Sequence, residues 1–345
     1  MDMRMMKRAV LRAFHEPLSL EQAPVPEPGA GEVLIRVKAS GLCVSDLHIQ
    51  DGMIGTVPLP HTPGHEMAGI VEKLGPGVEG VEVGQRMVAA IDVVCHMCRF
   101  CKSGRTNLCA RLVRIGFERD GSHAEFAVIP AENAFPIPDD LPFEQAAIIP
   151  DAVACMYNAL RNKANVQPGD RVLVLGTGGL GMQAIQIAKA MGAAVYATSR
   201  QDDKLEAALR LGCDGVVNTR TQDLKKEIVR LTNGEMLDAV LDNIGIETSI
   251  EESLMLVRPA GRVIIVGYNE PDFRANYQNT MKFEKEIIGM RGSSRGDLRD
   301  AIALVEAGKV VPYIAKTVPL EAINDALGEM RRGEAKGRIV IRMED

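Results

Sequence analysis

The chain has 345 residues, of which 46% are hydrophobic and 25% charged, so it can bury a sizeable core and is long enough for two domains. The net charge of −6 is modest and both signs are mixed along the chain, which argues against a nucleic-acid partner and against an anionic membrane surface. No stretch approaches the ~20 apolar residues of a membrane span, and the N-terminal segment has no signal-peptide pattern. We therefore expect a cytoplasmic protein that acts on a small molecule.

Short strands broken by glycine and proline make up the chain to about residue 150, a pattern typical of an all-β region. From about residue 170, apolar strands alternate with helical segments, which predicts a parallel, doubly wound sheet. The expected strands are 33–38, 68–74, 86–91, 125–129, 171–175, 195–198, 215–218, 237–242, 262–266 and 286–290. The expected helices are 180–191, 203–211, 298–307 and 321–331, and a closing strand covers 337–342.

Three potential metal ligands lie far apart in the chain: the thiol of Cys43, the imidazole of His65 and the carboxylate of Asp151. Together they would leave a fourth position open, which is the arrangement of a catalytic zinc rather than a structural one. Each residue also has a plain structural interpretation. Cys43 can be a small buried hydrophobe, and a lone histidine is more often a satisfied polar residue than a ligand.

A second set of potential ligands is local, in a lobe at about 92–112. It holds four cysteines within 15 residues, and four thiols at this spacing suit a closed tetrahedral zinc site. In a reducing compartment, metal binding by these thiols is favoured over disulfides. An iron–sulfur cluster is disfavoured because Ala110, not proline, follows the fourth cysteine. A nucleic-acid zinc finger is disfavoured because paired histidines and a basic helix are missing. His96 lies within the run and could compete as a ligand. The four cysteines are Cys95, Cys98, Cys101 and Cys109.

A glycine-rich turn follows the strand predicted at 171–175 and precedes a helical run, which is the context that a dinucleotide-binding turn requires. The first glycine permits the tight turn, the second lets the backbone approach the pyrophosphate, and the third lets helix and strand pack closely. A purely structural glycine turn is the alternative. The candidate cofactor-binding residues here are Gly176, Gly178, Gly179, Leu180 and Gly181.

The end of the next strand indicates which dinucleotide is preferred, because an acidic residue there binds the ribose 2′-hydroxyl and repels a 2′-phosphate. Ser199 stands where the acid is expected, and Arg200 offers a guanidinium suited to phosphate. This pattern favours NADP over NAD. NAD remains an alternative cofactor, because Asp202 and Asp203 follow closely in the sequence and Arg200 can be an ordinary surface residue.

These motifs occur together in one order: Cys-x-Ser-Asp-x-His, Gly-His-Glu-x-x-Gly, the four-cysteine loop and Gly-Thr-Gly-Gly-Leu-Gly. In this combination the chain resembles the zinc-containing medium-chain dehydrogenase/reductase family over nearly its whole length. The resemblance implies an α/β protein with two domains. Residues 1–155 and 296–345 would form a GroES-like β catalytic domain, and residues 156–295 a Rossmann coenzyme-binding domain with a doubly wound parallel sheet. It also implies a homo-oligomer, a dimer or a tetramer.

The resemblance also assigns roles to individual residues. Cys43 and His65 become ligands of the catalytic zinc, Glu66 a nearby or exchangeable ligand, and Asp46 the carboxylate that orients His65. The family's third ligand is usually cysteine or glutamate. Asp151 holds that place here, as in some bacterial NADP-dependent secondary alcohol dehydrogenases, and those are also similar to this chain at Ser199 and Arg200. Cys155, one helical turn further on, is the fallback ligand.

By the same resemblance, Ser45 receives the hydroxyl proton of the substrate and passes it through cofactor ribose hydroxyls to His48, which releases it to solvent. The alternatives are a turn hydroxyl and a surface histidine. Arg338 resembles the family's cofactor-phosphate arginine, although it can also be a surface charge beside the last strand.

The predicted function is a zinc-dependent alcohol dehydrogenase that moves a hydride between an alcohol, aldehyde or ketone and NADP or NAD, with two zinc ions per chain. A polyol or sugar dehydrogenase on the same scaffold is one alternative. A nucleotide-binding protein that has lost catalysis is another, because a fold does not guarantee a function. A zinc-free quinone reductase is disfavoured by the four-cysteine lobe.

Overall fold

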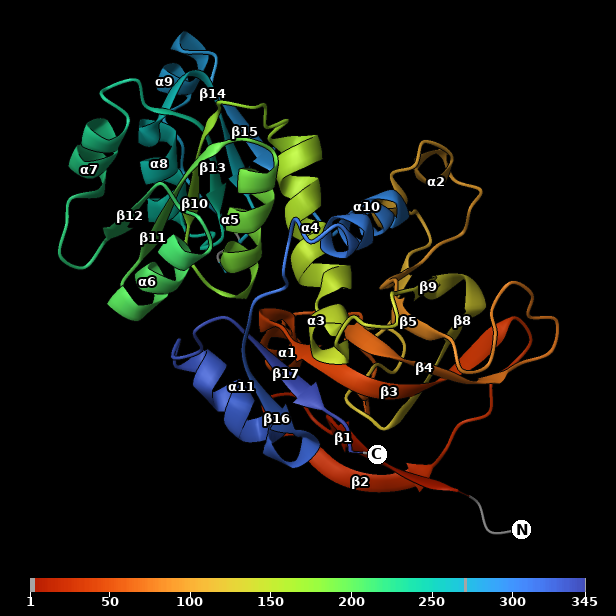
Figure 1. The fold of residues 1–345 in the computed structure, drawn as a ribbon. Helices are drawn as coiled ribbons and strands as arrows, with labels where there is room; N and C mark the ends of the chain where they lie inside the picture. The colour runs from red at the N-terminus through yellow and green to blue at the C-terminus, as the bar shows by residue number, and fades with distance from the viewer. Residues whose placement is uncertain (1–3, 270–271, 345) are drawn as a thin grey trace. The chain divides into compact units, whose positions relative to one another are not determined.

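The computed structural model describes residues 4–269 and 272–344. They divide into two compact units. The first unit takes its described residues from 1–154, 293–306 and 312–345, and the second from 155–292 and 307–311. The first unit is thus assembled from both ends of the chain (Figure 1).

The first unit is built on a mixed sheet whose strands run in the order β16-β17-β3-β4-β5-β9, with β8 paired to β3. The central strand β3 is antiparallel to its neighbours β17, β4 and β8. Separate two-stranded ribbons are formed by β1 with β2 and by β6 with β7. The strand bounds are β1 Met5–Val10, β2 Ser19–Pro24, β3 Glu32–Leu42, β4 Glu66–Leu74, β5 Arg86–Ala89, β6 Asp92–Val93, β7 Val113–Arg114, β8 Phe126–Pro130, β9 Ala134–Pro136, β16 Ile314–Pro319 and β17 Arg338–Arg342.

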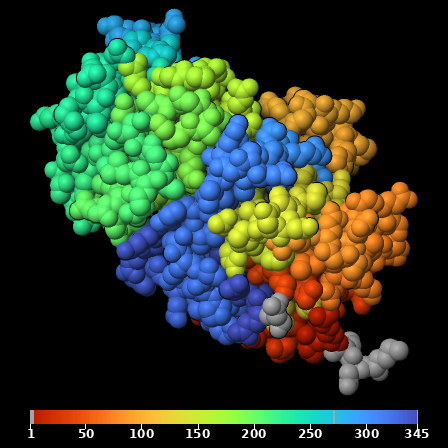
Figure 2. Space-filling model, in the orientation of Figure 1, coloured from red at the N-terminus to blue at the C-terminus, as the bar shows by residue number. Residues whose placement is uncertain are grey.

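The core of the first unit joins the two ends of the chain. Val33, Ile35 and Val37 of β3 are buried with Ile339 and Ile341 of β17, as the alternation of a half-buried strand requires. In Figure 2, blue atoms of the C-terminal part lie next to red atoms of the N-terminal part, as the pairing of β17 with β3 requires. Removal of the last strand would therefore expose one side of the central strand.

Short helices connect the strands of the first unit. Among them, η3 is a π-helical turn, and α11 packs against α1 and β16. The bounds are α1 Val44–Gln50, α2 Arg99–Lys102, η1 Thr106–Leu108, η2 Ala131–Asn133, α3 Phe143–Ala147, η3 Ile149–Val153, α10 Arg295–Glu306, η5 Leu320–Ala322 and α11 Ile323–Arg331. The chain then passes through α4 Ala154–Tyr157 and a second π-helical segment, η4 Asn158–Lys163, into the second unit.

The second unit is a six-stranded, all-parallel sheet in the order β12-β11-β10-β13-β14-β15. This order reverses between β10 and β13, so it is a doubly wound sheet with its switch point at the end of β10. In Figure 1, α5 and α6 lie in front of the sheet and α8 lies behind it. The bounds are β10 Arg171–Leu175, α5 Gly179–Ala190, β11 Ala194–Ser199, α6 Asp202–Arg210, β12 Gly215–Asn218, α7 Leu224–Leu231, β13 Leu237–Asp242, α8 Glu247–Leu256, β14 Val257–Ile265, α9 Tyr277–Lys282 and β15 Glu286–Gly289.

The predicted fold class and all of the predicted strands are confirmed. Two strands are longer than expected: β3 continues to Leu42, and β14 begins at Val257, five residues before the predicted start at Arg262. The early start was missed because Pro259 and Gly261 lie inside the segment, and the pairing with β13 shifts register there. Helices α1, α2, α3 and α4 were not predicted, and α7, α8 and α9 lie where helical segments were expected between strands but without predicted bounds. Among the described residues, no helix combines the length and the apolar composition needed to cross a membrane.

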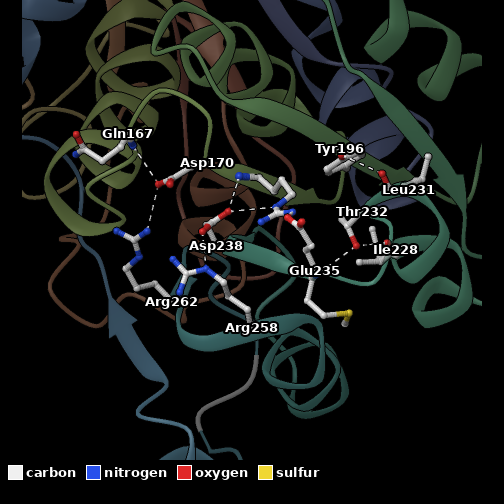
Figure 3. Close-up of polar contacts among 12 residues, drawn as sticks. Gln167, Asp170, Tyr196, Ile228, Leu231, Thr232, Glu235, Asp238, Arg258 and Arg262 are labelled. Carbon is white, nitrogen blue, oxygen red and sulfur yellow. Dashed lines mark hydrogen bonds and ion pairs between the residues drawn. The ribbon is translucent and has the colours of Figure 1, made fainter.

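A polar network pins the amino ends of the parallel strands (Figure 3). Asp238 of β13 accepts hydrogen bonds from the Arg171 amide at 2.8 Å and from the Arg258 guanidinium at 2.6 Å. Asp170 pairs with Arg262 of β14 at 3.2 Å. Burial raises the pKa of Asp238, but these two donors lower it by more, so the carboxyl titrates below its usual range. The network therefore links the amino ends of β10, β13 and β14, at the opposite end of the strands from the glycine turn.

We predict that Asp238→Ala lowers the free energy of unfolding by about 1–3 kcal/mol, because it leaves the part-buried Arg171 amide and Nε of Arg258 without their acceptor. The stabilisation is present above the ordinary carboxyl pKa and is lost as the pH falls through the depressed pKa of the folded state. Chemical denaturation at neutral and acidic pH measures both. Glu206→Ala removes an exposed carboxylate of the same unit and should change stability by less than about 0.5 kcal/mol; an equal loss in both variants would contradict the prediction.

Candidate metal and nucleotide sites

Cys43 lies at the junction between β3 and α1, where the central strand ends and a helix starts. Its side chain is buried, and its backbone N–H donates to the carboxylate of Asp46 at 2.8 Å. This bond satisfies one of the free amides at the start of the helix and holds the backbone of Cys43 in its N-cap position.

His65 immediately precedes β4, the neighbour of β3, and its ring packs on Phe117 with centroids 4.9 Å apart. The residue before it, Gly64, has a φ of +104°, and a Cβ there would come within 2.8 Å of His123 and Ser122. Glycine is therefore required next to the imidazole, both for the left-handed backbone and for the close approach.

Asp151 lies in the π-helical turn η3, after Pro150. Proline removes one backbone donor from the helix, and a π-turn re-aims the side chains that follow it, a feature frequent at functional sites. The carboxylate Oδ2 lies 3.5 Å from Cys43 Sγ and 3.6 Å from His65 Nε2. The structure thus brings together the three dispersed candidates, and their ligand atoms all lie within 4.8 Å of one another.

These distances fit a metal ion. Zinc–ligand bonds of about 2.0–2.3 Å in tetrahedral geometry separate neighbouring ligand atoms by about 3.3–3.8 Å. The electrostatics agree: burial lowers the pKa of His65, but hydrogen bonds and charge from Asp151 and Cys43 raise it well above its usual value. The cluster therefore attracts positive charge, which a divalent cation would supply in place of a proton.

Arg338 and Glu66 complete the buried charges around this cluster. Arg338 is only 4% exposed, and its Nη2 donates to Glu66 Oε1 at 2.7 Å and to Asp151 Oδ2 at 2.9 Å. Burial raises the pKa of Cys43, but Arg338 and His65 lower it by more, which favours the thiolate. Burial also raises the pKa of Glu66 well above its usual value, despite Arg338.

A Cβ on Gly41 would lie 1.9 Å from Glu66 Oε2, so a glycine at this position makes room for the Glu66 carboxylate. The charge pairing of Arg338 was missed from sequence, where the arginine was expected at a cofactor phosphate or on the surface. Its burial excludes the surface alternative, and a phosphate contact stays a prediction.

Ser45 and His48 both lie on α1, directly after Cys43. Ser45 is half-buried, and its hydroxyl lies 3.6 Å from Cys43 Sγ. His48 follows three positions later, so the two residues are neighbours on the helix surface. Burial lowers the pKa of His48, and the nearby Asp51 opposes this only in part. His48 is therefore a neutral base at neutral pH.

Asp46 was expected to orient His65. The structure places its Oδ1 3.4 Å from Nε2 of His123, a buried histidine that sequence reasoning missed. No hydrogen bond joins Asp46 to His65 among the described residues, where Nδ1 of His65 is buried without a partner. Burial raises the pKa of Asp46, but the two histidines and the Cys43 amide lower it by more.

The four thiols of the lobe at 92–112 converge, and their sulfur atoms all lie within 4.8 Å of one another. Cys98 Sγ is 3.5 Å from Cys101 Sγ, close to the ~3.8 Å expected between two thiolates on one zinc. Backbone amides, Ala110 first, lower the pKa of Cys98 to about 6, while burial and its neighbours raise the pKa of Cys101 to about 12. His96 is outside this set, because its ring is more than half exposed and pairs with Glu132 at 2.8 Å.

The glycine turn connects β10 to α5 with the geometry that the motif requires. Gly176 has a φ of +94°, and a Cβ on Gly181 would lie 2.2 Å from the Gly176 carbonyl oxygen. By contrast, nothing lies within 4 Å of a Cβ on Gly178, which caps the helix. Strand, helix and open backbone amides together can hold a phosphate group. Gly179 and Leu180 are the residues that start the helix.

The loop after β13 borders this turn and was not predicted as part of the site. Buried Asp242 accepts hydrogen bonds from the amides of Ile244 and Gly245 and from the Ser249 hydroxyl, and Asn243 donates to the Gly176 carbonyl at 3.4 Å. The position of the loop could have been inferred, since β13 is the strand beside β10 across the switch point, where such sheets bind their ligands.

Ser199 ends β11, and its hydroxyl accepts a hydrogen bond from the Gln201 amide at 3.1 Å. Arg200 is exposed. Asp202 is one of the two acids for which NAD remained an alternative cofactor. It accepts a hydrogen bond from the Asn218 side chain at 2.6 Å. Among the described residues, therefore, the end of β11 carries an exposed guanidinium, and the nearest acid is already paired.

Comparison with known proteins supports the combination of the two units. Residues 29–139 match the model of the alcohol dehydrogenase GroES-like domain, and residues 179–307 match that of the zinc-binding dehydrogenase domain. An alcohol dehydrogenase of Geobacillus stearothermophilus is 36% identical over 98% of this chain and all of its own length. An NAD-dependent alcohol dehydrogenase of Sulfurisphaera tokodaii is 34% identical over 94% of this chain and 96% of its own. A cobalt- and zinc-bound alcohol dehydrogenase of Pyrobaculum aerophilum superposes with a TM-score of 0.89, at 33% identity, over 98% of this chain and all of that one.

We predict that the zinc-loaded chain holds two metal ions and that Asp151→Ala loses one of them, because it deletes the carboxylate that faces both Cys43 and His65. Elemental analysis of the purified, zinc-loaded chain gives the ratio of zinc to protein. Cys155→Ala is the matched control and should retain both ions, since Cys155 is not in either ligand cluster. Loss of zinc only in the Cys155 variant would show that the third ligand was assigned to the wrong residue.

Proposed function

Because the chain belongs to the zinc-containing medium-chain alcohol dehydrogenase family, we propose that it oxidises primary or secondary alcohols reversibly, with NADP preferred over NAD. Membership makes it an oxidoreductase acting on CH–OH groups. The observation that supports the reaction most directly is the convergence of Cys43, His65 and Asp151 from three separate segments. A chain that had lost catalysis would be under no physical requirement to keep this buried set together.

We propose two zinc ions per chain, one at Cys43, His65 and Asp151, with Glu66 as a nearby or exchangeable ligand, and one at the four cysteines of the lobe. When bound, the first zinc supplies a Lewis acid for the substrate oxygen, and the dinucleotide supplies a hydride acceptor. The lobe ion would have a structural role, because four thiolates leave it no open position.

The protein's own contribution to the reaction is proton transfer and charge balance. Ser45 is close enough to the ligand set to take the hydroxyl proton of a bound alcohol, and His48 is a neutral base on the same helix that can receive it and exchange it with solvent. Arg338 holds Asp151 in place and compensates the buried negative charge. It also stays our candidate for a cofactor-phosphate contact.

The preference for NADP is proposed from the end of β11. Ser199 gives no carboxylate to repel a 2′-phosphate, exposed Arg200 can pair with one, and Asp202 is engaged by Asn218. The Sulfurisphaera relative is named NAD-dependent, so the preference rests on these residues of this chain and not on the comparison.

An activity screen tests the function. The zinc-loaded chain is assayed with primary alcohols, secondary alcohols and polyols and with both cofactors, following the absorbance of the reduced nicotinamide. We expect kcat/KM to be highest for simple alcohols with NADP, and Ser199→Asp to lower the value with NADP but not with NAD. Faster turnover of polyols would favour a polyol dehydrogenase, which the carboxylate ligand Asp151 also suits. No absorbance change with any alcohol or aldehyde would reject the proposed activity.

We predict that Ser45→Ala lowers kcat by roughly 10²–10⁴-fold, the loss typical of removing a general acid–base group, while zinc content is unchanged. Ser45→Thr keeps the hydroxyl and serves as the matched control, which should retain most of the turnover. Steady-state kinetics and elemental analysis of the same preparations separate the two effects. Unchanged turnover in Ser45→Ala would remove this residue from the proton path.

We also propose a homo-oligomer, a dimer or a tetramer. Strand β15 is at the edge of the parallel sheet, and Tyr277 and Met281 of the preceding helix are 70% and 71% exposed. An open edge next to exposed apolar side chains suits pairing with a second chain. Light scattering measures the mass, and a monomer would contradict this. The cytoplasmic location stays a prediction.

A further inference from the structure

His123 is a fully buried histidine that the proposed reaction does not use. It lies in the segment between β7 and β8, and this segment is hydrogen-bonded to the one that carries His65. The amides of Gly121, Ser122 and His123 donate to the carbonyls of residues 62, 64 and 63 at 2.7, 2.8 and 3.0 Å. The Ser122 hydroxyl also reaches the Glu66 carbonyl at 3.3 Å. The backbone around the proposed metal ligand is therefore braced by residues 121–123.

The two ring nitrogens of His123 face different groups. Nδ1 lies 2.9 Å from the Ser40 hydroxyl, which in turn lies 2.6 Å from the Ser122 hydroxyl. Nε2 faces Oδ1 of Asp46 at 3.4 Å. If Ser40 donates to Nδ1, the neutral ring carries its proton on Nε2. If Nδ1 donates to Ser40 instead, Nε2 must also be protonated, because a nitrogen lone pair cannot face a buried carboxylate. In both cases an N–H points at Asp46.

Asp46 joins this histidine to Cys43, one of the proposed metal ligands. Its Oδ2 accepts the Cys43 amide at 2.8 Å, and its charge also acts on His65. Oδ1 of Asp46, Nδ1 of His65 and Nε2 of His123 are all buried, and none has a hydrogen-bond partner among the described residues. A carboxylate oxygen can accept two hydrogen bonds, so Oδ1 of Asp46 has the capacity to satisfy both imidazole donors.

From this geometry we propose that His123 is a positioning residue for the catalytic metal. It donates to Asp46, and the carboxylate thus fixed holds the Cys43 backbone and receives the Nδ1 proton of His65, which leaves Nε2 of His65 free for the ion. Ser40 sets the orientation of the His123 ring. The inference rests on the proposed zinc site at Cys43, His65 and Asp151, and it extends that site to residues beyond the ligands.

The same three residue types form nucleophilic triads in hydrolases, but that role is excluded here. Ser40 and His123 are both completely buried, so no substrate can reach the hydroxyl. The hydroxyl also bonds the ring at Nδ1 while the carboxylate faces Nε2, which makes the array a support for Asp46 rather than an activated nucleophile.

The test is the stability of the metal at this site. We expect His123→Phe to weaken metal binding there by about 10–100-fold, the usual effect of removing such a support, and to release zinc faster to a chelator. His123→Gln, which keeps an N–H donor, should restore most of the affinity. Substitution with Co²⁺ gives a second readout, because its visible spectrum reports the ligand geometry and distinguishes a one-thiolate site from a four-thiolate site.

His61→Phe is the matched control. His61 is equally buried and faces a carboxylate, Asp120 at 3.3 Å, and in the described part of the chain no hydrogen bond or ion pair links it to the proposed ligands. We expect its zinc release and cobalt spectrum to match the wild type. If His123→Phe does not fold, Ser40→Ala makes the same test, because it removes only the hydroxyl that orients the ring.

Unchanged zinc release and an unchanged cobalt spectrum in His123→Phe, or in Ser40→Ala where that variant replaces it, would overturn the inference. So would an equal effect in His61→Phe, since the cause would then be general loss of stability. These outcomes leave the proposed function intact. If the wild-type chain binds no metal at Cys43, His65 and Asp151, the proposed function and this inference both fail.

Discussion

The burial of several acidic groups in one small volume is the constraint on which the first unit depends. Cys43, Glu66 and Asp151 meet there, and a single guanidinium, that of Arg338, is placed among them. Uncompensated buried charge is costly, so the cluster must either take up protons or bind a cation. With the three acids ionised and Arg338 charged, a divalent ion brings the set to neutrality. The raised pKa values of His65 and Glu66 show the other solution, in which protons replace the metal.

These groups lie where regular secondary structure begins, ends or is distorted. Cys43 stands where the central strand turns into a helix, His65 immediately precedes the neighbouring strand, and Asp151 lies in a π-helical turn. Arg338 begins the last strand, which pairs with β3 on its other side. Because β3 lies between β4 and β17, residues at the ends of the three strands are neighbours, although they are far apart in the chain.

Features formed by residues close together in the sequence could be predicted, and contacts between distant segments could not. The strands and the glycine turn were predicted because alternation, glycine spacing and the following helix all lie within about 20 consecutive residues. The four-cysteine lobe is local for the same reason. The dispersed ligand set was assigned from family resemblance, since Cys43 and Asp151 are 108 positions apart and their meeting depends on the tertiary fold. The partners of Arg338 and His123 could not be predicted, because buried pairing between distant segments leaves no periodic pattern.

Charge and orientation at the proposed metal site are supplied from different parts of the first unit. Arg338 acts on the anionic atoms through Glu66 and Asp151. Asp46, with His123 and Ser40 beside it, acts instead on the Cys43 backbone and on the far side of the His65 ring. The two systems meet at the Ser122 hydroxyl, which bonds Ser40 at 2.6 Å and reaches the Glu66 carbonyl at 3.3 Å. A cation held by Cys43, His65 and Asp151 would therefore depend on both systems, on Arg338 for the balance of charge and on Asp46 for the backbone at Cys43.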